Sequence, residues 1–323
     1  MSILDELVKD HPKIAIVGHV RPDGDCLGSI TGTYRYLTEN HPDLSVTAYS
    51  ADVPEYLRFL LSDVSIRETD GAGERYDLVI SVDASDRERI GAGSAAFSEA
   101  SETLVIDHHE TNPGFGDRNI IYPDASSTAE VLVGLMDPDR LSRSSATKLY
   151  TGIIQDTGVF RYSCTSADTL KAAAMLLCKG VDFSGIIEES VINQPYREMR
   201  IMGRVLEDSV LYADEQFIYG IAPTALQKEF GVTSHDLGNV VVELNAVKEA
   251  NVALFLYQFE DGSWKGSLRA KCDVNVAKAA SCFGGGGHKR AAGFSFVGDP
   301  AAVAETVRKR IGELRRAGNS DSE

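Results

Sequence analysis

The first part of the chain alternates short apolar runs with amphipathic stretches of helical period. Four runs rich in β-branched residues predict strands at 13–18, 44–49, 77–82 and 103–106. Six stretches between and after them predict helices at 27–39, 55–61, 94–100, 126–135, 142–155 and 166–179. Strands that are apolar throughout are buried on both faces. The pattern therefore predicts an α/β domain with a mostly parallel sheet and helices on both faces.

A second α/β pattern begins near residue 210. Strands are predicted at 215–221, 251–259, 263–270 and 293–296, and the middle two form a hairpin around Glu260-Asp261-Gly262. Helices are predicted at 234–249, 274–282 and 300–317. Between the two patterns the chain is helical and polar, and Pro195 interrupts it. We therefore predict a first domain at 1–185, a helical connector at 186–209, a smaller α/β domain at 210–318 and a tail at 319–323.

Composition narrows the class of protein. The 323 residues are 43% hydrophobic and 25% charged, which is enough apolar surface for packed cores and argues against a disordered chain. No stretch reaches the apolar length of a membrane span, so we expect no membrane partner. The first six residues are acidic where a signal peptide would be basic, so a cytoplasmic protein is expected. Five scattered cysteines without a CxxC pair argue against a disulfide framework or a zinc knuckle.

The net charge of −16 is unevenly distributed along the chain. Residues 1–210 hold 19 basic and 34 acidic side chains, whereas 211–323 hold 13 and 14. Within 265–290, six basic residues accompany Asp273 as the one acidic residue: Lys265, Arg269, Lys271, Lys278, Lys289 and Arg290. The total excludes a protein that coats long nucleic acids through counterion release. It permits an enzyme that binds phosphates through metal ions, because a divalent ion inverts the local field.

Acidic and histidine side chains gather where predicted strands or helices end, the edge at which open α/β sheets bind their ligands. Four segments carry them: GHVRPDGD at 18–25, SVDASD at 81–86, IDHHE at 106–110 and GIIQDTG at 152–158. Taken singly, each segment could be a solvated turn or a helix cap. Consecutive titratable groups after a buried strand, as in IDHHE, are costly unless a metal or a substrate uses them.

Together, these segments offer imidazole and carboxylate donors without a thiolate. Such donors suit Mn²⁺ or Mg²⁺, and imidazole favours Mn²⁺, Fe²⁺ or Zn²⁺ over Ca²⁺. Six side chains exceed what one ion takes from a protein, so we predict two ions about 3.5–4 Å apart, a clamp for hydrolysis at phosphorus. The six candidate ligands are His19, Asp23, Asp25, Asp83, His108 and Asp156.

The second domain has a candidate anion site in its glycine run. Four successive glycines at 284–287 allow backbone N–H groups to approach an anion closely. His288 and Arg269 can add charge-assisted hydrogen bonds to phosphate. A glycine run can also be a flexible linker, but this one lies between a predicted helix and a predicted strand, which favours a binding loop.

The motifs HVRPDGD, VDASD, DHH and QDTG, in this order, resemble those of the DHH family of phosphoesterases. In the second domain, SLRA at 267–270, DVN at 273–275 and FGGGGH followed by AAG at 283–293 resemble the DHH-associated domain. The resemblance covers nearly the whole chain and is closest to the nanoRNase/pAp phosphatase group.

This resemblance implies a role for each matched position. His19, Asp23 and Asp83 hold the first ion. Asp25, Asp83, His108 and Asp156 hold the second ion, so Asp83 is shared. His109 faces the substrate phosphate, Asp107 orients the two histidines, and together with Asp83 they form the catalytic set. The substrate-binding set is Arg269, Asn275, Gly285, Gly286, Gly287 and His288. The ions are expected to be Mn²⁺, with Mg²⁺ or Co²⁺ as substitutes.

The expected activity is hydrolysis of short oligonucleotides (nanoRNA) to mononucleotides, and of pAp to AMP. The expected partners are short RNA or DNA oligonucleotides and small nucleotides rather than long duplexes, together with a second copy of the chain in a homodimer. Cleavage of cyclic dinucleotides or pApA, and a nucleotide-binding module without catalysis, are the alternatives. The glycine-rich motif disfavours a family II inorganic pyrophosphatase.

Overall fold

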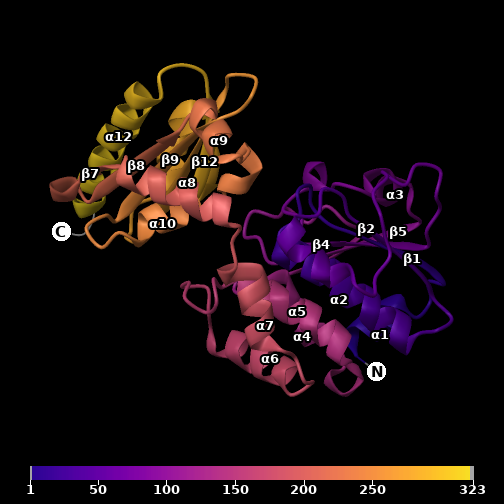
Figure 1. Cartoon of the computed structure of the whole chain (residues 1–323). Helices are drawn as coiled ribbons and strands as arrows, with labels where there is room; N and C mark the ends of the chain where they lie inside the picture. Colours follow the sequence, from indigo (N-terminus) through magenta and orange to yellow (C-terminus); the bar gives the residue numbers. More distant parts are fainter. Residues whose placement is uncertain (1, 321–323) are drawn as a thin grey trace. The chain divides into compact units, whose positions relative to one another are not determined.

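The computed structural model describes residues 2–320, and the chain divides into two compact units, Met1–Asn193 and Gln194–Glu323 (Figure 1). The segment predicted as a connector, 186–209, is divided between them. Its beginning packs into the core of the first unit through Ile186, whereas Ile201 and Val205 pack into the second. Of the predicted tail, residues 319–320 belong to helix α12 (Pro300–Ser320) and residues 321–323 lie outside the described part. The predicted limits of the two domains, 1–185 and 210–318, are not tested by this division and remain predictions.

A six-stranded, wholly parallel sheet forms the centre of the first unit, in the order β3-β2-β1-β4-β5-β6. The predicted α/β class is confirmed. The order reverses between β1 and β4, because β2 and β3 extend to one side of β1 and the later strands to the other. The strands are β1 (Lys13–Val17), β2 (Ser45–Tyr49), β3 (Ile66–Arg67), β4 (Leu78–Val82), β5 (Glu102–Asp107) and β6 (Arg118–Ile121).

Alternate residues of each strand pack against opposite layers, as the two-residue period of a strand requires. In β1, Ile14 and Ile16 pack against α2 (Gly24–Asn40), α4 (Thr128–Leu135) and α5 (Arg143–Asp156). Ala15 and Val17 pack on the other face, against α3 (Ser94–Glu99). Figure 1 shows α2, α4 and α5 on one side of the sheet and α3 on the other. This double cover explains why the strands are apolar throughout.

Helices α2 and α5 approach each other closely at Gly28. A Cβ atom at this position would lie 2.5 Å from the backbone oxygen of Lys148, so only glycine fits without moving a helix. The remaining helical segments of this unit are α1 (Ile3–Val8), α6 (Ala167–Leu177), α7 (Phe183–Ile187), the 3₁₀ turns η1 (Glu55–Leu61), η2 (Arg87–Arg89) and η3 (Pro138–Arg140), and the π-helical turn η4 (Glu188–Ile192).

The second unit is also built on a six-stranded sheet, in the order β11-β12-β10-β9-β8-β7. Only β8 and β9 pair in parallel; the other neighbours are antiparallel. The strands are β7 (Val210–Tyr212), β8 (Phe217–Ala222), β9 (Val252–Gln258), β10 (Trp264–Ala270), β11 (Gly286–His288) and β12 (Ala291–Phe296). One face packs against α11 (Val276–Ala280) and α12, and the other against α8 (Tyr196–Glu207) and α10 (Val240–Ala246). The remaining segments are α9 (Thr224–Phe230), η5 (Ala213–Glu215), η6 (Ser234–Leu237) and η7 (Ser281–Phe283).

Two predictions for the second unit are corrected. The glycine run does not form a loop throughout, since Gly286–His288 is the edge strand β11, paired with β12. The helix predicted at 234–249 is two short helices, η6 and α10, separated by Gly238 and Asn239. Both errors arise where backbone pairing or a glycine outweighs the apolar pattern.

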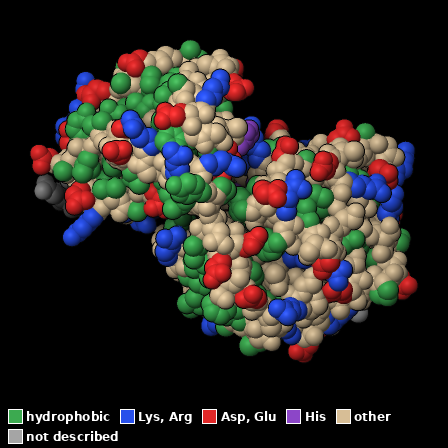
Figure 2. All heavy atoms as spheres, in the orientation of Figure 1, with side chains coloured by type: hydrophobic (Ala, Val, Ile, Leu, Met, Phe, Trp, Pro, Cys, Tyr) green, Lys and Arg blue, Asp and Glu red, His purple; other side chains and the backbone are tan. Residues whose placement is uncertain are grey.

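The surface carries many acidic side chains, as the negative net charge requires (Figure 2). Acidic side chains are spread over the visible face of the molecule rather than gathered in one patch (Figure 2). Within residues 2–320, none of the helices combines the length and apolarity needed to cross a bilayer.

Candidate metal centre

The ends of three parallel strands bring the predicted ligands of the first unit together. His19 follows β1 by two residues, Asp83 directly follows β4, and Asp107 is the last residue of β5. These strands are neighbours in the order β1-β4-β5, so their carboxyl ends meet at one edge of the sheet. The edge includes the point between β1 and β4 where the strand order reverses, where open α/β sheets form their binding crevice.

Asp83 is at the centre of the cluster. Its side chain is 3% exposed, its Oδ2 lies 3.6 Å from Nε2 of His19 and its Oδ1 lies 3.7 Å from Nε2 of His108. Its backbone is in the left-handed region, with φ of 54°, which aspartate tolerates better than most residues. The backbone N–H donates to the oxygen of Ile106 on β5, which holds the turn in place. One carboxylate is therefore within reach of two histidines from different strand ends.

The first turn of α2 contributes two more carboxylates. Asp23 is the N-cap of this helix and accepts hydrogen bonds from the backbone N–H groups of Asp25 and Cys26, and it lies 3.7 Å from His19. Asp25 is fully buried and accepts hydrogen bonds from the backbone N–H groups of Thr128 (2.7 Å) and Ala129 (2.9 Å). These are the first two residues of α4, so the positive end of that helix stabilises the Asp25 charge.

Asp156 completes the cluster from the last residue of α5, with Oδ2 3.3 Å from Nε2 of His108. Three overlapping groups have ligand atoms within 4.8 Å of one another: His19, Cys26 and Asp83; Asp83, His108 and His109; and Asp25, His108 and Asp156. The first two groups share Asp83, and the last two share His108. Five of the six predicted ligands belong to these groups. Asp23 belongs to none of them and joins the cluster through the 3.7 Å contact between its Oδ1 and Nε2 of His19.

Electrostatics indicate that this cluster fits a divalent cation. Burial raises the pKa of Asp25 well above its ordinary value, and repulsion from the charges of Asp83 and Asp23 adds to the increase. Burial also raises the pKa of Asp156 well above its ordinary value, and repulsion from the charges of Asp25, Asp23 and Asp83 adds to the increase. Buried like charges are unfavourable unless a cation compensates them. Carboxylate and imidazole donors are the set that Mn²⁺ and Mg²⁺ sites use, so the residues fit the predicted kind of ion.

Cys26 packs within the cluster, beside His19 and Asp83. The residue is fully buried, and burial raises the pKa of the Cys26 thiol to about 11. Its sulfur accepts a hydrogen bond of 3.3 Å from the backbone N–H of His19. This hydrogen bond helps to fix the turn that carries His19.

Asp107 holds His109 in one orientation. Its Oδ1 lies 2.8 Å from Nδ1 of His109 and also accepts a hydrogen bond from the backbone N–H of His108. Its Oδ2 accepts a hydrogen bond of 2.5 Å from the side-chain amide of Asn112. Burial acts to lower the pKa of His109, but the bond to Asp107 and the charge of Asp83 outweigh it and the net shift is upward.

Sequence reasoning missed two polar side chains of this cluster. The Thr128 hydroxyl donates to Oδ1 of Asp83 at 3.0 Å, and Asn112 donates to Asp107 and to the backbone oxygen of Ala84. Thr128 follows Ser126-Ser127, a helix-start signal that is fully explained by the Ser127 cap. Asn112 lies in a polar turn. Neither position carries a local sign that its side chain faces a carboxylate.

The predicted substrate-binding residues all belong to the second unit. Arg269 is on β10 and donates through Nη1 to the Leu268 oxygen, and the Asn275 side chain accepts from the backbone N–H groups of Ala277 and Lys278 as the cap of α11. Gly286 and His288 are exposed on β11. Gly285 and Gly287 pack so closely on β12 that a Cβ atom would lie within 2.5 Å of a backbone oxygen. Close packing against β12 is therefore enough to require glycine at 285 and 287, without any role in binding.

Comparison with known proteins identifies the family. Residues 13–153 match the DHH family, N-terminal domain, and residues 214–314 match the DHHA1 domain. A protein of Thermus thermophilus named bifunctional oligoribonuclease and PAP phosphatase NrnA is 33% identical over 98% of this chain and 95% of its own length. A protein of the same name from Bacillus subtilis is 29% identical over 86% of this chain and 87% of its own length.

A solved structure agrees over the full chain. The crystal structure of an exopolyphosphatase-related protein from Bacteroides fragilis matches with a TM-score of 0.89 and 25% identity, and covers 97% of this chain and 96% of that one. The fold and these relatives define an α/β hydrolase that acts on phosphoester bonds, of a metal-dependent family, and the acidic and histidine cluster is its candidate metal site. The chain belongs to the DHH family, with a DHHA1 domain in its second unit. The predicted family is confirmed.

Proposed function

We propose that this protein hydrolyses short oligonucleotides to mononucleotides and removes a phosphate from pAp to give AMP. The observation that carries the proposal is the buried Asp83 carboxylate between His19 and His108, with Asp25 and Asp156 beside them. The relatives named oligoribonuclease and PAP phosphatase support it, because they match this chain over most of both lengths.

The proposed first ion has His19, Asp23 and Asp83 as ligands, and the second has Asp25, Asp83, His108 and Asp156. When bound, two such ions lower the pKa of water and neutralise charge on phosphate oxygens. The residues around them fix their positions. Thr128 holds one oxygen of Asp83, and the N-terminus of α4 holds both oxygens of Asp25.

His109 is proposed to contact the substrate phosphate. The 2.8 Å contact between Nδ1 of His109 and Asp107 is a hydrogen bond that Nδ1–H donates, so the other ring nitrogen, Nε2, is the one left for the substrate. When the ring is protonated, Nε2–H can donate to a phosphate oxygen or to the leaving oxygen. Asp107 acts through His109 and is a positioning residue in this proposal.

The second unit is proposed to bind the remaining phosphates and the sugar of the substrate. Arg269, Asn275, Gly285, Gly286, Gly287 and His288 are the proposed contacts. Six basic residues lie within 265–290, and Asp273 forms an ion pair of 2.5 Å with Lys289. A local basic segment of this size suits a substrate with a few phosphates, whereas long nucleic acids need a far larger basic surface.

A substrate panel tests the proposal. Purified protein with Mn²⁺ is incubated with pApA, a pentanucleotide, pAp and cyclic di-AMP, and the products are separated by chromatography. We expect release of AMP from pApA and from pAp. Turnover of cyclic di-AMP alone would favour the cyclic dinucleotide alternative, and no hydrolysis of any substrate at saturating Mn²⁺ would refute the enzyme. The Asp156→Asn variant is the matched inactive control.

Three finer expectations belong to the same proposal. Mn²⁺ is the proposed resident ion, to be measured by elemental analysis of protein purified without added metal. The proposed oligomer is a homodimer, to be measured by light scattering. The proposed location is the cytoplasm, to be measured by fractionation of cells that produce the protein.

A further inference from the structure

The segment after β2 leaves the sheet at the same edge as the metal ligands. β1 and β2 are parallel neighbours, with Lys13 opposite Ser45 and Ile16 opposite Ala48. β1 leads to His19 and then to α2, and β2 leads to the 3₁₀ turn η1. Since parallel strands present their carboxyl ends on one side, η1 and the first turn of α2 emerge side by side.

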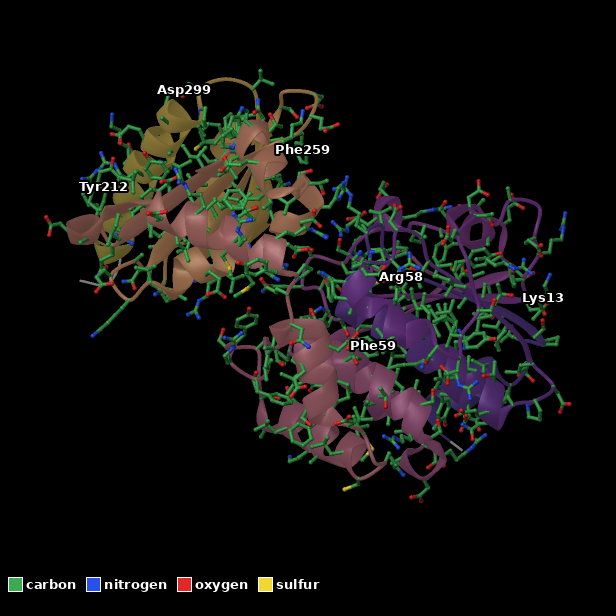
Figure 3. The ribbon with its side chains drawn as sticks, viewed as in Figure 1. Lys13, Arg58, Phe59, Tyr212, Phe259 and Asp299 are labelled. Atoms are coloured by element: carbon green, nitrogen blue, oxygen red, sulfur yellow. The ribbon has the colours of Figure 1, made fainter. Side chains whose placement is uncertain are left out.

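Apolar packing fixes η1 against α2. Leu57 and Leu60 of η1 are buried against Leu27 of α2. Leu27 belongs to the first turn of α2, and its backbone N–H donates to the backbone oxygen of Asp23, the N-cap of the helix. Figure 3 shows Arg58 and Phe59 of η1 next to the α2 ribbon. The turn η1 therefore packs on the first turn of α2, the turn that the proposed ligand Asp23 caps.

Tyr56 directly precedes Leu57 in this turn, and its ring is not part of the core. It is 42% exposed, whereas Leu57 is fully buried. Tyr56 therefore stands, half exposed, on a turn that packs beside the first turn of α2, the helix that Asp23 caps. Partial burial raises the pKa of Tyr56, and the charge of Asp23 raises it further.

We propose that the ring of Tyr56 stacks on a nucleobase of the substrate and so determines the preference for nucleotides over other phosphoesters. This inference rests on the proposed function. The metal centre recognises phosphate, which nucleotides share with every other phosphoester. A base has a π-face whatever its identity, so an aromatic platform binds all bases and rejects none. Such a contact suits an enzyme whose substrates vary in sequence.

The test compares two variants on two substrates. Tyr56→Ala removes the ring, and Tyr56→Phe removes only the hydroxyl. The substrates are pApA and an analogue of pApA in which the nucleoside at the cleaved bond lacks its base. Phe183→Ala is the matched control, because Phe183 is an aromatic side chain of the same unit that is 50% exposed. Thermal unfolding followed by circular dichroism checks that every variant is folded.

We expect Tyr56→Ala to lower kcat/KM on pApA about 5- to 100-fold, the range of stacking contributions per base, and to leave the abasic analogue within twofold. Tyr56→Phe and Phe183→Ala should match the wild type on both. Equal losses on both substrates, or no loss on pApA, would overturn the stacking role. If the wild type hydrolyses neither pApA nor pAp, the proposed function itself fails, and the Tyr56 role fails with it.

Discussion

Replacing Asp83 with asparagine tests whether one carboxylate serves both ions. Asparagine keeps the size of the side chain and tolerates the left-handed backbone of this position, with φ of 54°. Alanine would add backbone strain to the loss of charge. Asp83→Asn is therefore the cleaner variant, and Asp83→Ala should behave alike. The matched control is Asp86→Asn, because Asp86 caps the turn η2 and belongs to none of the ligand groups.

The expected change in stability follows from linkage. At a Mn²⁺ concentration 100 times its dissociation constant, binding stabilises the native state by about 2.7 kcal/mol. For a unit of the size of Met1–Asn193 this corresponds to an increase in Tm of about 5–10 °C. A shared ligand should cost at least the roughly 100-fold in affinity found for strong outer-sphere changes. The same Mn²⁺ concentration then contributes only about 0.4 kcal/mol, or about 1 °C.

The metal-free variant should respond in the opposite direction. The charge of Asp83 contributes to the raised pKa values of Asp25 and Asp156, so its removal relieves repulsion. The Tm of metal-free Asp83→Asn should equal or exceed that of the wild type. Differential scanning calorimetry with and without Mn²⁺ measures both effects, and hydrolysis of pApA measures activity, which should fall at least 100-fold. A wild-type Mn²⁺ shift, or activity above a tenth of the wild type, would refute the shared ligand.

Four further predictions concern other parts of the molecule. Asp107→Asn should lower kcat by about 10- to 100-fold, since it weakens the charged hydrogen bond with His109, which is worth about 1.5–3 kcal/mol. The Mn²⁺ content should be unchanged, and a loss of metal measured by elemental analysis would contradict this role. Gly28→Ala should destabilise the first unit by about 1–3 kcal/mol in urea unfolding, because its Cβ would meet the Lys148 backbone, whereas Gly32→Ala, which meets the movable Leu149 side chain, should cost less. Arg269→Ala should raise KM for dinucleotides in steady-state assays without changing Mn²⁺ content, and loss of metal would contradict the separation of roles. Burial acts to raise the pKa of Asp5, but hydrogen bonds with His41 and Ser2 and the charge of Arg140 outweigh it, so the net pKa lies below 3.8. The stability that ionised Asp5 contributes is therefore fully present above pH 3.8 and is lost as the pH falls through the pKa of the folded state. Asp5→Asn should accordingly cost about 1.5–3 kcal/mol at pH 7 in guanidinium unfolding, and the difference from wild type should shrink below pH ~4.

Much of the first unit could be predicted because its central strands are apolar throughout. The runs ending at Val17, Val82 and Asp107 were found within one or two residues, and the ligand segments directly follow them. The edge strands were missed for physical reasons. β3 has two residues, and β6 begins with Arg118 and Asn119. Edge strands need not be apolar on both faces, so they give a weak signal.

The cluster itself could be predicted by residue type but not by geometry. The six candidate ligands are recognisable because each is a carboxylate or imidazole at the end of an element. The residues that hold them are not recognisable, since Thr128 contacts Asp83, 45 residues away, and Asn112 contacts Ala84, 28 residues away. The Gly28 contact with Lys148 likewise joins residues 120 positions apart. Such pairs depend on the packing of whole elements, which no local pattern encodes.

The hydrogen bonds between Asp25 and α4 have a consequence for local opening of the protein. The backbone amides of Thr128 and Ala129, at the start of α4, donate hydrogen bonds to the carboxylate of Asp25 in α2. The same carboxylate is a candidate metal ligand. Transient separation of α2 from α4 would expose both amides to solvent and would at once remove a metal donor. Hydrogen exchange at Thr128 and Ala129 therefore becomes a direct reporter of metal occupancy, with slower exchange as Mn²⁺ is added.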